Sequence, residues 1–160
     1  MKNKGILLPV FSLPSRYGIG DFGQEAYKFV DFLAETGNRY WQILPLNQTS
    51  FGDSPYQSPS AYAGNPYFID LEALCREGLL TEEELAEQEE PQGGVDYARL
   101  YERRYRVLRR AFSRFDTEGE EFLRFRRETP WLEEYCLFTA IKNANGGREW
   151  RTWESAQKTV

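Results

Sequence analysis

The chain has 160 residues, of which 41% are hydrophobic and 16% aromatic, so it can build a core and is not disordered throughout. Its formal charge of -5 leaves no overall basic field to hold a phosphate backbone, which argues against a nucleic-acid partner. The sequence has no histidine, which removes the commonest general base, the Ser-His and Cys-His pairs and every histidine-containing metal site. Any activity must rest on carboxylates, hydroxyls, amides and aromatic rings.

The cysteines and the N-terminal residues indicate the cellular compartment and the kinds of site that the chain can form. Cys75 and Cys136 lie far apart and form no Cys-x-x-Cys motif, so we expect neither a zinc site nor a redox pair. The apolar run 6–8 is ended by Pro9, far short of a signal-peptide core or a membrane span. We therefore expect a soluble, cytoplasmic chain with no metal and no membrane partner.

The first half of the chain is typical of an α/β fold. Two short, nearly all-apolar runs, 5–9 and 40–46, predict strands that are buried on both faces. Asp21 as N-cap, Gln24 as third helical residue and Gly37 as stop predict an amphipathic helix between them. Its apolar stripe is Phe22, Ala26, Phe29 and Leu33. The resulting βαβ unit predicts a parallel sheet with a right-handed connection.

From residue 47 to residue 64 the periodicity disappears, which predicts a long loop. The loop leaves the carboxyl end of the second predicted strand, where parallel sheets and barrels place their binding sites. Loops of this length inside a compact domain are usually functional or disordered, and the aromatic residues here argue against disorder. Residues 67–71 predict a third extended segment.

The second half of the chain predicts helices. Thr81 and Glu84 form a capping box that opens a short acidic helix. Longer helices are expected at about 96–115 and at 120–127. The apolar face of the first of these, which we expect to point into a core, is Tyr101, Tyr105, Leu108, Ala111, Phe112 and Phe115.

The last predicted helix begins at Pro130 after a Thr129 cap and ends at Asn145. Beyond it, Trp150 and Trp153 have little sequence left to bury them. A parallel sheet of two or three strands is also too small to stand as an ordinary domain, because its edges are open and its faces only partly covered. Truncation explains both observations.

The loop around residues 51–58 is the best candidate site. Sugars present apolar faces that stack on aromatic rings, and hydroxyl rims that need short polar partners. The loop offers both kinds of group: Phe51, Tyr56 and Tyr62, with Asp53, Ser54, Gln57 and Ser58. The alternative is a turn-rich loop whose tyrosines only pack on the sheet, since Gly, Asp, Ser and Pro are also ordinary turn formers.

Three carboxylates, those of Asp53, Asp70 and Glu72, lie nearest the predicted site edge. The acid and nucleophile of a retaining glycosidase must lie about 5 to 5.5 Å apart, and nothing in the sequence brings two of these residues together. We expect them to serve in turns, in caps or as surface charges, and we predict no catalytic residue among them.

The charged residues and the tyrosines of the predicted helices can also be explained by structural roles alone. The arginines between residues 103 and 127 are interleaved with carboxylates, so we expect a solvated face rather than a phosphate site. Tyr97, Tyr101 and Tyr105 recur at four-residue spacing and are expected to face a core. The functional alternative is a tyrosine exposed at the helix margin as a sugar platform.

Six short motifs in the first 70 residues form one ordered series. They are 6–9 (ILLP), 12–15 (SLPS), 17–23 (YGIGDFG), 40–46 (YWQILPL), 52–58 (GDSPYQS) and 63–67 (AGNPY). The series closely resembles the opening of the amylomaltases, the 4-α-glucanotransferases of the α-amylase-like superfamily. Residues 95–97 and Gly146, Gly147, Trp150 and Trp153 extend the resemblance over almost the whole chain.

The resemblance implies a (β/α)8 barrel with inserted helical subdomains. It also implies transfer of α-1,4-glucan segments between maltooligosaccharides through a covalent glycosyl-enzyme intermediate, without metal or organic cofactor. A complete barrel needs about 250 residues, so this chain supplies only an opening part. We assign residues 1–75 to the first βα units and residues 76–160 to a mainly helical insertion. The family's catalytic Asp, Glu and Asp then lie beyond Val160, and the chain alone is expected to be inactive.

The resemblance also implies binding roles for particular residues. Ser54 and Tyr56 match the family's loop beside the donor subsites, and Asp53 and Gln57 stand in the same motif as candidate substrate-binding residues. Tyr101 matches an aromatic of a secondary glucan-binding groove. Its partner position, usually tyrosine in the family, is Phe51 here.

Two other functions remain open at this point. One is a free-standing glucan-binding module, which predicts glucan binding without turnover. The other is a protein-interaction fragment that uses the charged helices. If the chain folds alone, its exposed strand edges predict self-association.

Overall fold

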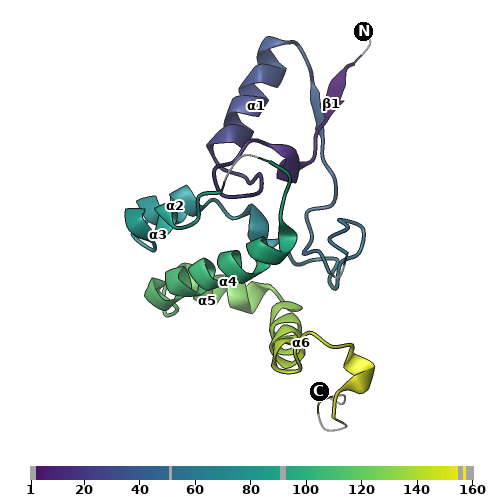
Figure 1. Ribbon diagram of the computed structural model, residues 1–160, viewed down its shortest axis with the longest axis vertical. Helices are drawn as coiled ribbons and strands as arrows, with labels where there is room; N and C mark the ends of the chain where they lie inside the picture. The colour runs from purple at the N-terminus through teal and green to yellow at the C-terminus, as the bar shows by residue number, and fades with distance from the viewer. Residues whose placement is uncertain (1–2, 51, 91–92, 155–156, 158–160) are drawn as a thin grey trace. The chain divides into compact units, whose positions relative to one another are not determined.

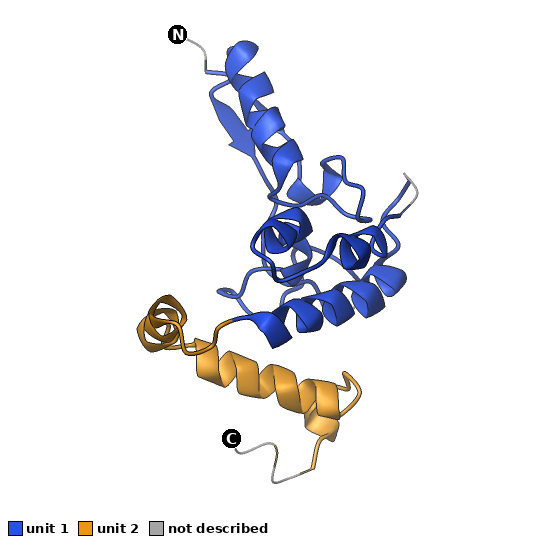
Figure 2. Ribbon diagram, turned by 90° about the vertical axis from the view of Figure 1, so that its left-hand side faces the viewer, with its two compact units in different colours: residues 1–115 blue, residues 116–160 orange. Residues whose placement is uncertain are grey.

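The computed structural model describes residues 3–50, 52–90, 93–154 and 157 (Figure 1). The chain divides into two compact units, residues 1–115 (unit 1) and residues 116–160 (unit 2), which are coloured separately in Figure 2. Within the described ranges, no helix combines the length and the hydropathy that crossing a membrane requires. All sequence-predicted binding residues, Phe51 aside, fall among the described residues of unit 1.

Unit 1 is a mixed α/β unit with a small sheet followed by helices. Its elements in chain order are β1 (Gly5–Leu7), η1 (Val10–Ser12), α1 (Gln24–Glu35), β2 (Tyr40–Gln42), η2 (Pro66–Phe68), α2 (Leu71–Arg76), α3 (Glu82–Ala86) and α4 (Tyr97–Arg114). β1 and β2 pair in parallel, with Ile6 opposite Trp41, so the predicted βαβ arrangement is confirmed. The described strands form an open two-stranded sheet and not a closed barrel.

The sheet and α1 meet through aromatic packing. The Trp41 ring lies edge-on to Phe29 of α1, with ring centroids 5.0 Å apart. The Trp41 indole N–H also donates a 2.7 Å hydrogen bond to the Leu8 carbonyl oxygen, which ties β2 to the end of β1. Both strands are shorter than predicted, because Pro9 leads directly into η1 and the chain leaves β2 after Gln42.

The predicted N-cap of α1 is wrong. Gly23 occupies the cap position, and the helix begins at Gln24. The Asp21 carboxylate instead accepts a 2.9 Å hydrogen bond from the Gly23 backbone N–H, so Asp21 makes a turn just before the helix. The predicted stop is correct, because Gly37 takes a left-handed φ of 67° directly after the helix.

The third extended segment, expected at 67–71, is also wrong. The region forms η2 and the start of α2, because two side chains cap helical turns there. Asn65 accepts a 3.0 Å hydrogen bond from the Tyr67 N–H, and Asp70 accepts a 2.8 Å bond from the Glu72 N–H. Tyr67, Phe68 and Leu71 of the segment are buried from these turns, while Ile69 is 41% exposed.

The buried face of the long helix α4 coincides only in part with the predicted one, because Ala111 is buried and Tyr105 and Leu108 pack against the core. Tyr101, Phe112 and Phe115 are 52%, 60% and 40% exposed, so the predicted core face is wrong at these positions. The buried stripe is Leu100, Arg104, Val107 and Ala111. This stripe could not be predicted from hydropathy, because Arg104 places a charged residue where the pattern requires an apolar one.

Two clusters of buried side chains form the core of unit 1. The first joins the segment after β1, α1, η2 and α4, and consists of Val10, Leu13, Ile19, Ala26, Tyr67, Phe68 and Leu100. The second joins α2, α3 and the middle of α4, and consists of Tyr17, Leu71, Leu80, Leu85, Val107 and Ala111. The segment 10–20 contributes to both clusters, so it links the sheet to the helices.

Unit 2 is helical. Its elements are α5 (Glu120–Glu128), α6 (Leu132–Ala144) and η3 (Trp150–Thr152). α6 starts two residues later than predicted, with Trp131 at its cap position, and ends as predicted before Asn145. The expectation that both C-terminal tryptophans lack cover holds only for Trp150, which is 51% exposed. Trp153 is buried against Phe138, with ring centroids 5.5 Å apart.

Candidate functional site

The loop 47–64 is closed at its base by the backbone. Asn47 and Gly64 form an antiparallel bridge, and the Asn65 N–H donates a 2.8 Å hydrogen bond to the Leu46 carbonyl oxygen. The two ends of the loop therefore lie side by side, as in a compact Ω-type loop. The loop is thus a defined surface feature at the end of β2 and not an open linker.

Backbone hydrogen bonds also fix the tip of the loop. The Ser50 N–H donates to the Gln57 carbonyl oxygen at 3.0 Å, and the Gln57 N–H donates to the Ser54 carbonyl oxygen at 3.1 Å. Gly52 and Asp53 both adopt left-handed φ angles, of 95° and 54°. Aspartate tolerates this conformation better than most side chains, because its short polar group can bond locally.

The structure brings Asp53, Ser54, Tyr56 and Gln57 together on this tip. The Ser54 hydroxyl accepts a 3.3 Å hydrogen bond from the Tyr56 N–H, so Ser54 orients the backbone that carries the Tyr56 ring. Tyr56 is 73% exposed. The tyrosine is therefore presented to solvent and is not used for packing on the sheet. Phe51, the predicted partner of Tyr101, lies outside the described residues.

A second aromatic group lies on α4. Tyr97 and Tyr105 both pack against the buried Tyr67 ring, with centroid distances of 6.4 and 6.0 Å. Tyr101 lies edge-on to Tyr105 at 5.0 Å and is half exposed. The expected core-facing row is thus correct for Tyr97 and Tyr105, which are half-buried, while Tyr101 stands at the margin.

One hydrogen bond joins the loop to α4. The Gln48 amide donates a 2.8 Å hydrogen bond to the Tyr105 hydroxyl. The charge of Asp53 also reaches this helix: burial raises the pKa of Tyr97, and Asp53 raises it further. The base of the loop and the aromatic row are therefore in direct contact at Gln48 and Tyr105. The sequence analysis did not predict a role for Gln48, because 57 residues separate it from its partner Tyr105.

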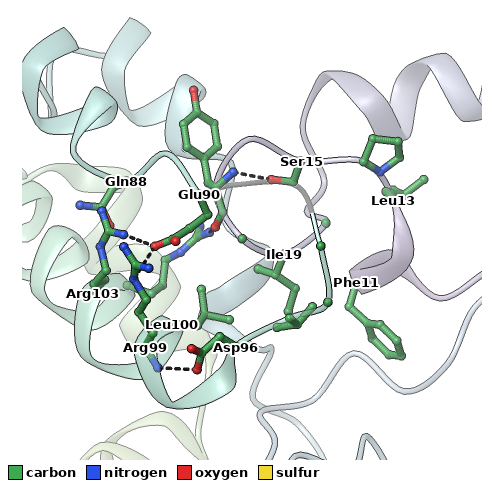
Figure 3. A pocket seen from close by; sticks show the side chains of 18 of the residues that line it. Phe11, Leu13, Ser15, Ile19, Gln88, Glu90, Asp96, Arg99, Leu100 and Arg103 are labelled. Carbon is green, nitrogen blue, oxygen red and sulfur yellow. Dashed lines mark hydrogen bonds and ion pairs between the residues drawn. The ribbon is translucent and has the colours of Figure 1, made fainter.

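A hollow of unit 1 lies elsewhere. It has a volume of about 700 Å³, and segment 11–20, segment 93–96 and α4 line it (Figure 3). Glu90 forms ion pairs in it with Arg103 and, at 3.0 Å, with Arg99. None of the predicted glucan-binding residues lines this hollow. The candidate site is therefore an open surface and not this cavity.

The other carboxylates serve structural roles, as predicted for Asp70. Asp70 caps α2 and pairs with Arg76 at 3.2 Å. Glu72 accepts a 3.1 Å hydrogen bond from the Tyr17 hydroxyl, and burial together with this bond raises the pKa of Tyr17 to about 12. Among the described residues, no group of three or more cysteines and carboxylates is arranged to hold a metal ion.

The described chain thus combines a mixed α/β fold with an exposed tyrosine among short polar groups at a loop tip. A family model described as 4-alpha-glucanotransferase, of glycoside hydrolase family 77, matches residues 8–160. The chain therefore belongs to the 4-alpha-glucanotransferase family.

Individual relatives agree with the family match. The chain is 50% identical over 155 residues to the 4-alpha-glucanotransferase of Thermus thermophilus, covering 93% of this chain and 30% of that protein. It is 45% identical over 148 residues to the enzyme of Clostridium butyricum, covering 90% of this chain and 30% of that protein. A solved amylomaltase from Streptococcus agalactiae, in complex with acarbose, superposes with a TM-score of 0.89 at 43% identity, covering 97% of this chain and 32% of that one. The chain spans about a third of the length of these relatives and corresponds to their N-terminal portion.

Proposed function

We propose that this chain forms the glucan-binding N-terminal portion of a 4-α-glucanotransferase, with loop 47–64 holding part of an α-1,4-glucan. The observation that carries the proposal is the tip of the loop, where a 73% exposed Tyr56 ring stands beside Asp53, Ser54 and Gln57. Such a ring offers an apolar face to a glucose unit, and its neighbours offer donors and acceptors to the hydroxyl rim. The amylomaltase solved in complex with acarbose supports a carbohydrate ligand.

In this proposal, Tyr101 and Phe51 belong to a secondary groove beside the loop. Tyr101 is 52% exposed on α4, and the Gln48–Tyr105 hydrogen bond holds the loop against that helix. Phenylalanine at position 51 keeps a stacking face and lacks the hydroxyl that a tyrosine would add. A glucan lying across both places would contact the loop tip and the helix together.

The parent reaction in this proposal is a retaining double displacement. A carboxylate attacks the anomeric carbon of the donor glucan and the glycosidic bond breaks, while a carboxylic acid protonates the leaving sugar. The 4-hydroxyl of a second glucan then attacks the glycosyl-enzyme and gives its proton to the carboxylate that acted as the acid, while the bond to the nucleophilic carboxylate breaks. We place all these carboxylates beyond Val160, so the present chain contributes binding and not chemistry. No metal or organic cofactor enters these steps.

The fold we propose for the parent is a (β/α)8 barrel. Residues 1–75 supply its first βα units, and residues 76–160 supply an inserted helical subdomain and a return toward the barrel. The parallel β1–α1–β2 unit supports this assignment, because βαβ units are the building blocks of such barrels. We further propose a cytoplasmic location, since two cysteines far apart in sequence suit a reducing compartment.

Calorimetry with maltoheptaose tests the binding role. We expect the natural chain to release heat on titration, and Tyr56→Ala to weaken the affinity by about tenfold, because a stacked ring contributes on the order of 1 kcal/mol or more. Tyr27→Ala is the matched control, since Tyr27 on α1 is 70% exposed and lies outside the loop. Tyr27→Ala should leave the affinity unchanged.

Two results would contradict the proposal. If the natural chain gives no heat with maltoheptaose, the loop does not bind glucan by itself. If the purified chain releases glucose from maltotriose in every preparation, the catalytic carboxylates do not lie beyond Val160. A chain that binds maltoheptaose without turnover agrees with the proposed division of roles.

A further inference from the structure

The hollow beside α4 contains polar groups that the fold of unit 1 leaves unused. Its volume of about 700 Å³ is within the range of about 300 to 1,000 Å³ that small-molecule sites occupy. In Figure 3 the side chains of Gln88, Glu90, Arg99 and Arg103 gather on one side of the hollow, and Phe11 lies on the opposite side. We call these four polar residues the polar wall.

Gln88 is a buried residue whose side-chain amide has no partner. The turn after α3 fixes its backbone, since its N–H donates a 2.9 Å hydrogen bond to the Leu85 carbonyl oxygen. The residue is only 9% exposed, yet its amide forms no hydrogen bond with any residue that the structure describes. The other buried polar residues, Asn65 and Arg104, both hydrogen-bond backbone groups. Because an unpartnered buried amide costs stability, the Gln88 side chain points to a partner from outside the chain.

Glu90 and Arg99 also keep unused hydrogen-bonding groups. Arg103 donates to Oε1 of Glu90, and Nε of Arg99 lies 3.0 Å from the same oxygen. Within the described part of the chain, the second Glu90 oxygen, Oε2, accepts no hydrogen bond, and the terminal nitrogens of Arg99 donate none. The polar wall therefore presents an acceptor, several donors and an amide that can both donate and accept.

The charges around the hollow indicate a neutral ligand. Arg99 and Arg103 supply two positive charges, and Glu90 and Asp96, which also lines the hollow, supply two negative ones. The Arg104 guanidinium is bonded to two backbone carbonyl oxygens. A phosphate or carboxylate would be repelled by the carboxylates of the lining. Neighbouring hydroxyls fit better, because one can donate to a carboxylate while the next accepts from a guanidinium.

Apolar side chains form the rest of the lining. Ile19 and Leu100 are buried, and Phe11 is half-buried. A sugar ring presents an apolar C–H face as well as a rim of hydroxyls, so it can contact both these residues and the polar wall. A flexible polar chain without such a face would leave the apolar part of the hollow unused. The lining as a whole therefore fits a short sugar.

We propose that this hollow is a binding site for a short neutral sugar of the size of maltose, separate from loop 47–64. Gln88, Glu90 and Arg99 hydrogen-bond its hydroxyls, and Ile19 and Leu100 contact its C–H face. The site goes beyond the proposed function and does not depend on it, because no residue of loop 47–64 lines the hollow.

Titration with maltose, followed by saturation-transfer NMR, tests the site. All chains in the test carry Tyr56→Ala, so that the loop tip does not contribute. We expect this chain to bind maltose, and the further change Gln88→Leu to weaken the affinity at least tenfold, because it removes the amide and keeps the side chain's size. Gln24→Leu, the same change at an exposed position of α1, should leave the affinity unchanged. The urea midpoint of the Gln88→Leu chain should be equal or higher, since the amide has no partner in the protein.

Several results would overturn the sugar site. They are a chain that does not bind maltose, equal affinities for Gln88→Leu and Gln24→Leu, and displacement of maltose by an equal concentration of inorganic phosphate, which would make the hollow an anion site. A Gln88→Leu chain that loses stability together with binding also contradicts the proposal, because the amide would then hold the fold. If circular dichroism shows that chain to be unfolded, Arg99→Met takes its place and should weaken maltose binding at least tenfold. Maltoheptaose calorimetry, with and without Tyr56→Ala, still reports on the loop independently.

Discussion

Asp21 is a carboxylate in the turn before α1, where its side chain accepts the Gly23 backbone N–H. Burial raises its pKa from 3.8 to about 6, against the opposing effects of that hydrogen bond and the Arg104 charge, and nearby Asp70 and Glu72 raise it further. Between these two pKa values the folded state holds a proton that the unfolded state has lost. Because of this difference in protonation, the free energy of unfolding decreases as the pH rises from about 4 to about 6.

Replacing Asp21 by asparagine should reveal this effect. Asp21→Asn keeps the acceptor for the Gly23 N–H and removes the titration. Relative to the natural chain, we expect the variant to gain about 2 kcal/mol in free energy of unfolding between about pH 4 and about pH 7. Urea unfolding at a series of pH values measures this. Asp31→Asn, at an exposed position of α1, is the control. A difference that does not change with pH would show that Asp21 titrates alike in both states.

Contacts between residues that lie far apart in the sequence could not be predicted from local sequence patterns. Arg104 is 1% exposed, and its guanidinium donates hydrogen bonds to the carbonyl oxygens of Tyr17 at 3.1 Å and Ile69 at 3.2 Å. A helical pattern marks an arginine as solvated, because only the folded chain brings those two carbonyl groups to it. The Gln48–Tyr105 bond was hidden for the same reason. In contrast, the composition of residues 53–57 predicted their gathering on one loop tip, because near neighbours in a turn stay together.

Among the elements, those with strong local signals were predicted best. The Thr81 and Glu84 side chains form the predicted capping box of α3, with hydrogen bonds of 3.2 and 3.0 Å. The periodicity likewise located α4 within a residue at each end, and the structure adds Asp96 as its N-cap. Segment 66–76 was missed, because its aromatic residues favour a strand while the Asn65 and Asp70 caps favour helical turns. Here the caps decide the structure.

The capping box of α3 also connects to the end of α4. Arg114 donates two hydrogen bonds to the Glu84 carboxylate, at 2.6 and 2.9 Å. The pKa of Glu84 is lowered to about 2, mainly by the hydrogen bonds from Arg114 and to a smaller extent by the hydrogen bond from the Thr81 N–H. Because the folded pKa is below the ordinary one, the stabilisation is present above about pH 4.5 and is lost as the pH falls toward 2.

Removing the cap should loosen this connection. We expect Thr81→Ala to lower the free energy of unfolding by about 1 kcal/mol at neutral pH, because the Glu84 N–H loses its acceptor. Thr129→Ala, at the C-terminal end of α5, is the matched control and should change stability by less than about 0.5 kcal/mol. Thermal unfolding followed by circular dichroism compares the two. Equal effects would mean that the box does not stabilise α3.

At the scale of the whole molecule, the candidate glucan-binding residues gather in unit 1. The loop tip, Gln48 and the aromatic row of α4 all precede residue 116, where unit 2 begins. Both buried clusters of unit 1 are likewise built from residues within 1–115. The sequence predicted the helical character of unit 2, yet the division at residue 115 depends on contacts that no local pattern contains.

A chain that ends at Phe115 should therefore keep the binding properties of the full 160 residues. We expect residues 1–115 to retain the circular dichroism of a folded unit and to bind maltoheptaose within about twofold of the full chain's affinity, because no proposed contact is removed. Calorimetry on both chains checks this. A folded 1–115 chain that binds more than about tenfold more weakly would place part of the site in unit 2.

The Gln48–Tyr105 hydrogen bond carries a thermodynamic consequence for the loop and the helix. Local opening of α4 around Tyr105 breaks that bond and releases the loop from the helix, while the Asn47–Gly64 bridge keeps the base of the loop closed. A glucan that binds only the loop held against α4 then favours the closed state of the helix by RT ln(1 + [L]/Kd). Amide hydrogens near the middle of α4 would exchange more slowly in the presence of sugar, although the sugar touches none of them. The helix thus becomes a reporter of occupancy at the loop.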